Sequence, residues 1–137
     1  MNFDTRVAIV LLDDLPIWQK LNVTAFLATG IAGAAPEAMG EPYLDANGAR
    51  YARLLGQPIM IHAAEGAILH RVRQQALQRD LQRAVYVRAM FGTGHDAANR
   101  EAFRAEPADT PDLVGIAVRG PAKDVQKAVK GAPLQGC

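Results

Sequence analysis

Residues 16–33 read PIWQKLNVTAFLATGIAG, and this stretch decides how the rest of the chain is interpreted. Apolar residues recur at helical spacing on most sides of it, so the sequence predicts a deeply buried helix that packs closely on a sheet and is covered from elsewhere. Lys20 stands among these residues and shares a face with Thr24, four positions later. Either Lys20 reaches solvent from a partly buried turn, or it places a positive charge at a binding site.

The segments around this helix indicate a sheet. VAIVLL at 7–12 is a continuous apolar run, typical of a strand covered on both faces, and it leads directly into the helix. The helix start should therefore lie at the carboxyl edge of the sheet, where open α/β folds bind ligands. Three further apolar segments are expected to be strands, at 58–62, 84–91 and 112–118. Because helical patterns alternate with these strands, the sequence predicts a three-layer α/β domain, with helices at 65–81, within 92–105 and at 121–130.

A β-hairpin is expected between the first helix and the second strand. EPYLDANGARYARL has strand-like flanks around Asn47 and Gly48, a pair that favours a tight hairpin turn. The hairpin at 41–53 lies outside the four-strand core and exposes apolar residues, and such surface often binds a partner. We therefore expect a homodimer that involves Tyr43, Leu44, Tyr51 and Leu54.

Composition and charge argue against several classes of protein. Across 137 residues, 15 Lys+Arg stand against 14 Asp+Glu, and the formal net charge of +1 gives no overall attraction to nucleic acid or to an anionic membrane. The longest uncharged run, 21–36, is too short and too polar to cross a membrane. Cys137 is the only cysteine, so an intramolecular disulfide is excluded and a cytoplasmic location is expected. We expect one domain over 1–131 and a flexible tail over 132–137.

A second polar cluster is TGHDAAN, which begins at Thr93. Interpreted as a site, it offers His95 as an acid/base group oriented by Asp96. Interpreted as local structure, it offers Thr93 as the cap of a helix, with Asp96 in the first turn. The two interpretations are compatible. Trp18 and Phe91 are expected either at the mouth of this site or in the core.

Other motifs carry little chemistry. The chain has no Gly-x-Ser-x-Gly elbow, P-loop or Gly-x-Gly-x-x-Gly motif. His62 and His70 do not have metal-ligand spacing, so neither a metal site nor a cofactor is expected. A basic stripe after the last strand either contacts RNA phosphates or forms a solvated helix face, and the interruption by Asp124 favours the solvated face. This stripe consists of Arg119, Lys123, Lys127 and Lys130.

Taken in order, several segments resemble the DUF2000 family, an uncharacterised bacterial family, over about residues 4–131. The most distinctive are WQKLNV and MFGTGHDAAN, and the others include GEPYLDANGARY, QPIMIHA and DLVGIAVRGPAKDVQKAVKG. That family in turn resembles the type II peptidyl-tRNA hydrolase fold, through a strand followed by a Lys-bearing helix and a final strand that runs into a Gly-Pro helix start. The resemblance implies an α/β/α architecture with a mixed four-stranded sheet, often as a dimer.

Type II peptidyl-tRNA hydrolases cleave the ester that joins a peptide to tRNA, without a metal. Lys20 matches their functional lysine, whose ammonium could hold a phosphate or stabilise an oxyanion. Thr93 matches a threonine in their Asp-bearing segment, but no Asp of this chain matches the carboxylate. Leu27 stands where some of these hydrolases have a His.

Three functional hypotheses remain. The chain binds a small or anionic ligand, tRNA included, in a cleft that Lys20 shares with the Thr93–Asp96 loop; or it hydrolyses peptidyl-tRNA or a related ester; or it is a non-catalytic dimeric scaffold. The candidate catalytic residues are Lys20, Thr93 and His95, and the candidate ligand-binding residues are Asn22, Thr24, Asp96 and Asn99.

Overall fold

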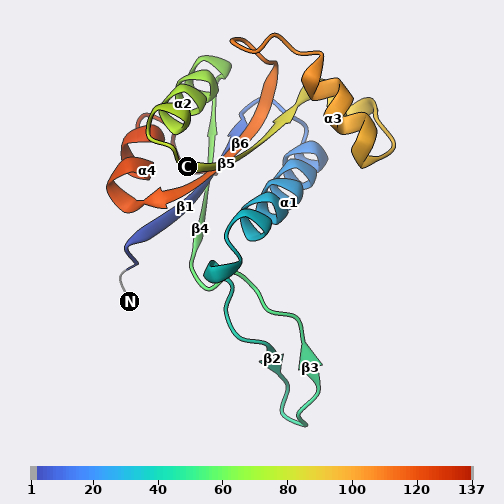
Figure 1. Cartoon of the computed structure of the whole chain (residues 1–137), viewed down its shortest axis with the longest axis vertical. Helices are drawn as coiled ribbons and strands as arrows, with labels where there is room; N and C mark the ends of the chain where they lie inside the picture. Colours follow the sequence, from blue (N-terminus) through green and yellow to red (C-terminus); the bar gives the residue numbers. More distant parts are fainter. Residues whose placement is uncertain (1–2, 137) are drawn as a thin grey trace.

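A four-stranded sheet forms the centre of the protein in the computed structural model, which describes residues 3–136 (Figure 1). Its strands lie in the order β4-β1-β6-β5; β1 and β4 are parallel, and β6 is antiparallel to both of its neighbours. The predicted mixed four-stranded sheet is therefore confirmed. The strands are β1 (Thr5–Leu12), β4 (Ile59–Ala64), β5 (Gln82–Val87) and β6 (Leu113–Pro121).

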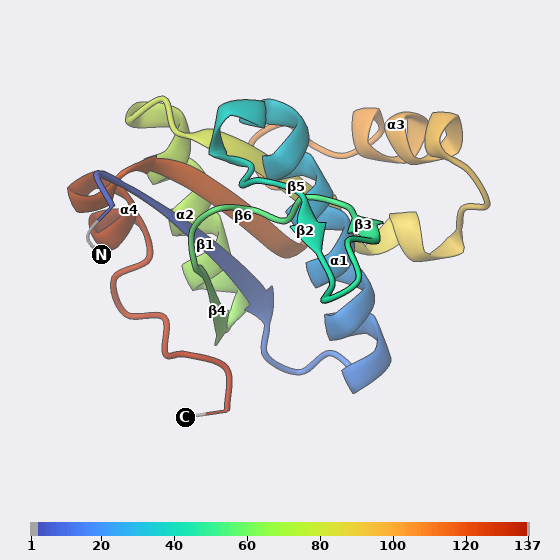
Figure 2. The ribbon, with the colours of Figure 1, turned by 90° about the horizontal axis from the view of Figure 1, so that it is seen from below.

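Helices cover both faces of this sheet, which gives three layers (Figure 2). One face carries α1 (Ile17–Ala34), and the opposite face carries α2 (Gly66–Gln78) and α4 (Ala122–Ala128). α3 (Asp96–Arg104) packs instead against η2 (Arg88–Gly92), beyond the end of β5. Each face has its own apolar core. Among residues 3–136, no helix is long and apolar enough to cross a membrane.

α1 lies close to the sheet because glycines stand where the two meet. A Cβ on Gly115 of β6 would come within 2.6 Å of Val23 Cγ1, and a Cβ on Gly30 of α1 would come within 2.7 Å of Ala84 Cβ in β5. Only residues without a side chain allow this approach. The buried side chains of α1, which pack into the core on this face, are Val23, Leu27 and Ile31.

The outer side of α1 is not covered, which corrects the expectation of a helix buried all round. Ile17 is 77% exposed, and Leu21 and Phe26 are each more than half exposed. The reason is that the chain between α1 and β4 does not form a layer over the helix but turns away from the body as the hairpin (Figure 1). A large apolar surface therefore faces solvent along α1.

The segment after β5 departs from the strand predicted over 84–91. Pairing with β6 ends at Val87, and residues 88–92 form the short helix η2. The N–H of Arg88 still donates to the carbonyl oxygen of Asp112 at 3.0 Å, but β6 begins only at Leu113, so the neighbouring strand offers no further ladder partner. The other two predicted strands continue past their expected ends, to Ala64 in β4 and to Pro121 in β6.

Residues 40–56 form an arm that extends away from the body (Figure 1). The arm follows η1 (Pro36–Ala38), and its tip is the predicted hairpin, in which β2 (Tyr43–Leu44) pairs antiparallel with β3 (Arg50–Tyr51). Two backbone bonds close the base of the arm: Gly40 donates to Leu54 at 2.8 Å, and Gly56 donates to Ala38 at 2.7 Å. The arm is therefore joined to the body by paired backbone on both limbs.

Asp45 organises the turn of the hairpin. Its Oδ1 accepts the backbone N–H groups of Ala49 and Asn47, both at 2.9 Å. These bonds favour the charged carboxylate and hold the pKa of Asp45 below its usual value. Gly48 supplies the left-handed backbone conformation of the turn, with φ +86°.

The C-terminal residues lie along the free edge of β4. The N–H of Ala63 donates to the carbonyl oxygen of Pro133 at 3.0 Å, and that of Gln135 donates to Ile61 at 2.9 Å. The sequence predicts a flexible tail over 132–137, of which Cys137 lies outside the described residues. Up to residue 136, these bonds add a short antiparallel stretch to the edge of the sheet.

Candidate functional site

A groove of about 620 Å³ lies at the end of the sheet where β5 runs into η2. α1 forms one wall, and η2, the loop after it and α3 form the other. α1 contributes Trp18, Asn22 and Phe26, which stand four residues apart and so share one side of the helix. The opposite wall contributes five residues of the predicted polar cluster: Thr93, Gly94, His95, Asp96 and Asn99.

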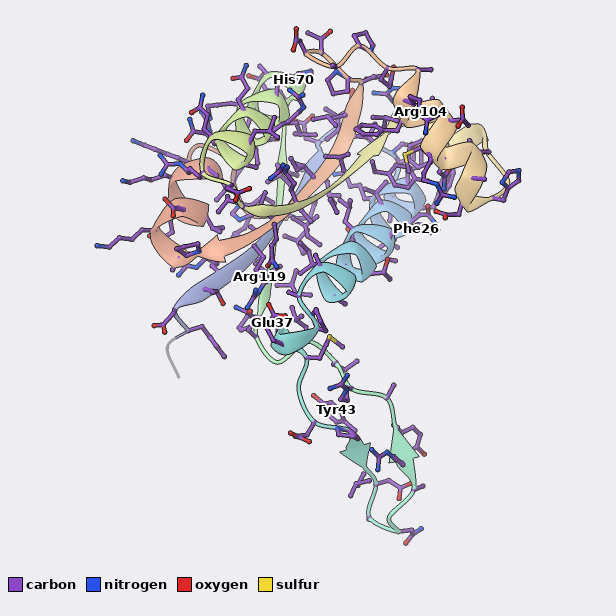
Figure 3. All side chains as sticks on the ribbon, in the orientation of Figure 1. Phe26, Glu37, Tyr43, His70, Arg104 and Arg119 are labelled. Atoms are coloured by element: carbon purple, nitrogen blue, oxygen red, sulfur yellow. The ribbon has the colours of Figure 1, made fainter. Side chains whose placement is uncertain are left out.

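Four aromatic rings line the groove in a continuous series. Trp18 meets Phe91 edge-on with ring centroids 5.9 Å apart, Phe91 lies 5.1 Å from Tyr86, and Tyr86 lies 6.0 Å from Phe26. These distances are typical of favourable aromatic pairs. Phe26 points from α1 towards the side where α3 lies (Figure 3). Of the two alternatives for these residues, Trp18 lines the groove, whereas Phe91 both lines the groove and packs against the core on the α1 face.

Tyr86 links the core to the groove. Its side chain is largely buried, and burial raises the pKa of its hydroxyl above the ordinary value of 10.0. The hydroxyl makes no hydrogen bond to another residue among 3–136. Every fully buried side-chain oxygen in that range does have a hydrogen-bond partner, so the Tyr86 hydroxyl oxygen is not fully buried and remains accessible to solvent. A neutral phenol can both donate and accept, and this one is available to a molecule in the groove.

His95, not Thr93, caps α3. The Nδ1 atom of His95 accepts the backbone N–H of Ala98 at 3.2 Å. The Thr93 hydroxyl instead turns back and donates to the carbonyl oxygen of Met90, at 3.0 Å, or to Asn99 Oδ1. The predicted Thr93 cap is thus corrected, because α3 begins at the residue after His95 and only His95 occupies the cap position. With Nδ1 as acceptor, the proton of a neutral His95 sits on Nε2.

The charges in the groove pair with each other. Asp96 forms an ion pair with Arg100, four residues along α3, and does not bond to His95. Arg100 is the one Lys or Arg that lines the groove within residues 3–136, and Asp96 is the one carboxylate. The His95–Asp96 unit predicted from the sequence is therefore not assembled. No group of three or more His, Cys, Asp or Glu side chains in that range lies close enough together to bind a metal ion.

Two carboxamides stand on opposite walls of the groove, Asn22 on α1 and Asn99 on α3. In the hydrogen bonds among residues 3–136, the Asn99 side chain takes part only through its Oδ1, and the Asn22 side chain takes part in none. Each amide therefore keeps donors, and Asn22 also keeps its acceptor, for another molecule.

Lys20 and Thr24 lie outside the groove, so the expected cleft between Lys20 and the Thr93–Asp96 loop does not form. Lys20 is two positions from Trp18, which puts the two side chains on nearly opposite sides of α1. Its Nζ donates to Gln135 Oε1 at 3.2 Å, in the tail that lies along β4. The Thr24 hydroxyl donates back to the Lys20 carbonyl oxygen at 2.7 Å.

Sequence reasoning missed Phe26, Tyr86 and Arg100 as groove residues. Phe26 and Tyr86 stand in apolar segments that read as core. A usable signal was the row Trp18, Asn22, Phe26, in which an amide stands between two aromatic residues at helical spacing. The i,i+4 spacing of Asp96 and Arg100 likewise predicts the ion pair that neutralises this wall.

Comparisons with known proteins agree with this fold. A family model described as "Protein of unknown function (DUF2000)" matches residues 5–135. The solved structure of a protein of unknown function, Atu0240 from Agrobacterium tumefaciens strain C58, is similar at 47% identity over 98% of this chain and 100% of that chain, with a TM-score of 0.94. No match was found among curated proteins. Because the family model matches nearly the whole chain, the protein belongs to the DUF2000 family.

Proposed function

We propose that the groove between α1 and α3 binds a small, planar, uncharged molecule that carries hydrogen-bonding groups on its rim. The observation that carries this proposal is the combination of an aromatic lining with polar groups that bond to no other residue. Among residues 3–136 these groups are the Tyr86 hydroxyl, the side-chain amide of Asn22 and the amide nitrogen of Asn99. Pockets for small molecules typically combine an apolar lining with a few such polar groups.

The aromatic side chains that line the groove are the reason for proposing a planar ligand. Trp18, Phe91, Tyr86 and Phe26 form a series with centroid separations of 5.1–6.0 Å, so an aromatic guest can add to the series by stacking or edge contact. A saturated guest of the same size would gain area burial but no such geometry. The volume of about 620 Å³ falls in the range of small-molecule pockets.

The ion pair between Asp96 and Arg100 is the reason for proposing an uncharged ligand. Arg100 is already engaged with Asp96, and Lys20 donates to the tail on the other side of α1. An anion in the groove would have to compete with Asp96 for Arg100 while lying near the Asp96 carboxylate, which is unfavourable. The charge pattern thus supports a neutral ligand over the anionic one expected from the position of Lys20 in the sequence.

A separate proposal is that the chain is related to the type II hydrolases and hydrolyses peptidyl-tRNA. The arrangement of residues in the groove supports this proposal poorly. Lys20 and Thr93 do not share a cleft, and the groove carboxylate is engaged with Arg100. We expect no cleavage above background in a peptidyl-tRNA assay. Cleavage that is lost in Thr93→Val would establish the reaction and the site together.

The fluorescence of Trp18, the only tryptophan, reports directly on the groove. Benzamide, which is flat, neutral and carries an amide, should change this fluorescence with a dissociation constant on the order of millimolar, as fits a fragment of its size. Benzoate tests charge, and cyclohexanecarboxamide tests planarity. Each should bind about tenfold more weakly than benzamide, a difference of about 1.4 kcal/mol.

A matched pair of variants on α1 tests the location. Asn22→Ala should weaken benzamide binding roughly fivefold to tenfold, the loss expected for one hydrogen bond. Gln19→Ala changes a neighbouring residue that does not line the groove, and it should leave binding unchanged. Equal affinity for benzamide and cyclohexanecarboxamide, or an Asn22→Ala variant that binds like the wild type, would overturn the proposal.

A further inference from the structure

α1 exposes an apolar surface that is unusual for the outer side of a helix. Ile17, Trp18, Leu21 and Phe26, here called the helix patch, are each more than half exposed. Lys20 is the only charged residue in α1, and it points to the tail on β4. Helices that are apolar all round are normally buried on all sides. The helix patch therefore has the composition of a contact surface.

The arm exposes a second apolar surface. Tyr43, Leu44, Tyr51 and Leu54, here called the arm patch, are each more than half exposed. The arm stands clear of the body, and Tyr43 projects from it far from the sheet (Figure 3). An isolated two-stranded hairpin is only marginally stable in water, so an arm of this kind gains stability by packing on another surface.

The two patches together reach the area of a typical interface. Side chains of this kind present on the order of 100 Å² each when half exposed, so the eight together offer roughly 800 Å², the area that each partner contributes to a standard interface. Neither patch alone reaches that value.

We propose that the chain forms a twofold homodimer in which the arm patch of each copy packs on the helix patch of the other. In a twofold dimer each contact occurs twice, so both patches of both copies are covered at once. Because a second copy carries both patches, one kind of contact can cover both surfaces of each chain. Trp18 and Phe26 belong both to the helix patch and to the lining of the groove, so the arm of the partner would pack at the edge of the groove, and the dimer is tested without ligand.

Sedimentation velocity of the full chain over a concentration series tests the dimer. The wild type should change from monomer to dimer with rising concentration. Leu44→Asp in the arm patch and Leu21→Asp in the helix patch should each raise the dissociation constant at least about tenfold, because each buries an unpaired charge. Both positions are exposed in the single chain, so the variants should fold and keep the wild-type circular dichroism spectrum.

Leu77→Asp is the matched control. Leu77 is also a partly exposed leucine, but it lies on α2, on the opposite face of the sheet, and its substitution should leave the dimer intact. A wild type that stays monomeric at all concentrations, or a dimer that persists in Leu44→Asp or Leu21→Asp, would overturn the proposal.

Cross-linking tests which patch meets which. In a Cys137→Ser background, chains with Leu44→Cys are mixed with chains with Leu21→Cys and treated with a short bismaleimide. A linked dimer should form in the mixture and in neither sample alone. Linkage of Leu44→Cys chains to each other in the absence of Leu21→Cys would show that arm meets arm, and the proposed arrangement would be wrong.

Discussion

The two ends of the four-stranded sheet both carry polar side chains, but these are bonded in different ways. At the end where β1 and β5 begin, the Arg119 guanidinium donates to Gln82 at 2.9 Å, to Gln57 at 3.1 Å and to Thr5 at 3.4 Å. It also lies 3.5 Å from the Glu37 carboxylate, at the base of the arm (Figure 3). These partners come from segments far apart in the chain.

At the groove end, the polar side chains bond only to near neighbours. Asp96 pairs with Arg100, and His95 accepts from Ala98. Such bonds shape α3 and its loop but do not join α3 to α1. The polar groups of Asn22 and Tyr86, on the other side of the groove, bond to no other residue among 3–136.

The difference separates a structural cluster from the proposed binding site. A donor whose bonds are filled by distant parts of the chain contributes to folding and has little left for a ligand. A group that bonds locally, or not at all, contributes little to tertiary stability and remains available. Substitutions at the Arg119 end should therefore change the free energy of unfolding, and substitutions at the groove end should change binding.

Arg119→Met should cause the largest loss of stability, about 2 kcal/mol, because it removes hydrogen bonds from a charged donor whose side chain is only 12% exposed. Its partners Gln57 and Gln82 would also lose the donor that their side-chain oxygens accept from. The measurement is urea unfolding followed by circular dichroism.

Arg100→Met is the matched control at the groove end. It breaks an exposed ion pair within one helix, so it should cost no more than about 0.5 kcal/mol. Similar losses in Arg119→Met and Arg100→Met would contradict the distinction between the two ends.

The fold could be predicted because its determinants are local. Apolar runs marked the strands, and Asn-Gly marked the hairpin turn, each within a few residues. Arg119 could not be assigned in this way. Its position before Lys123 suggested a basic stripe, but its partners Thr5 and Gln57 are 114 and 62 positions away, and only the paired strands bring them together.

The candidate site could be predicted only in part for the same reason. The TGHDAAN cluster was found because it is contiguous, and it does line the groove. The direction of Lys20 depends on the rotation of α1 about its axis, which is set by Val23, Leu27 and Ile31 packing on the sheet. A lysine two positions from Trp18 then faces away from the groove. Pattern analysis placed Lys20 at the end of the sheet where the groove lies, but the lysine stands on the side of the helix that faces away from the groove.

Tyr86→Phe should have a smaller and pH-dependent effect on stability. Below pH 10 it should cost less than about 1 kcal/mol, since the hydroxyl bonds to no other residue among 3–136. Burial raises the pKa of Tyr86 in the folded chain, so above pH 10.0 the unfolded state loses the proton first and the wild type becomes less stable as pH rises. Phenylalanine cannot titrate. The stability difference should therefore shrink above pH 10, and a difference that stays constant from pH 8 to pH 11 would contradict the role of burial.

Lys20→Met should have the smallest effect of all, on both stability and binding. The substitution keeps most of the apolar stem and removes one hydrogen bond from Nζ to Gln135 Oε1, between exposed side chains. The expected loss is no more than about 0.5 kcal/mol, and Gln135→Ala should reproduce it, with the double variant no worse than either single variant. Benzamide binding, followed by Trp18 fluorescence, should be unchanged, because Lys20 and the groove lie on different sides of α1. Weaker benzamide binding in Lys20→Met, with Gln135→Ala unchanged, would mean that the lysine reaches the groove in solution, and the separation of Lys20 from the site would have to be abandoned.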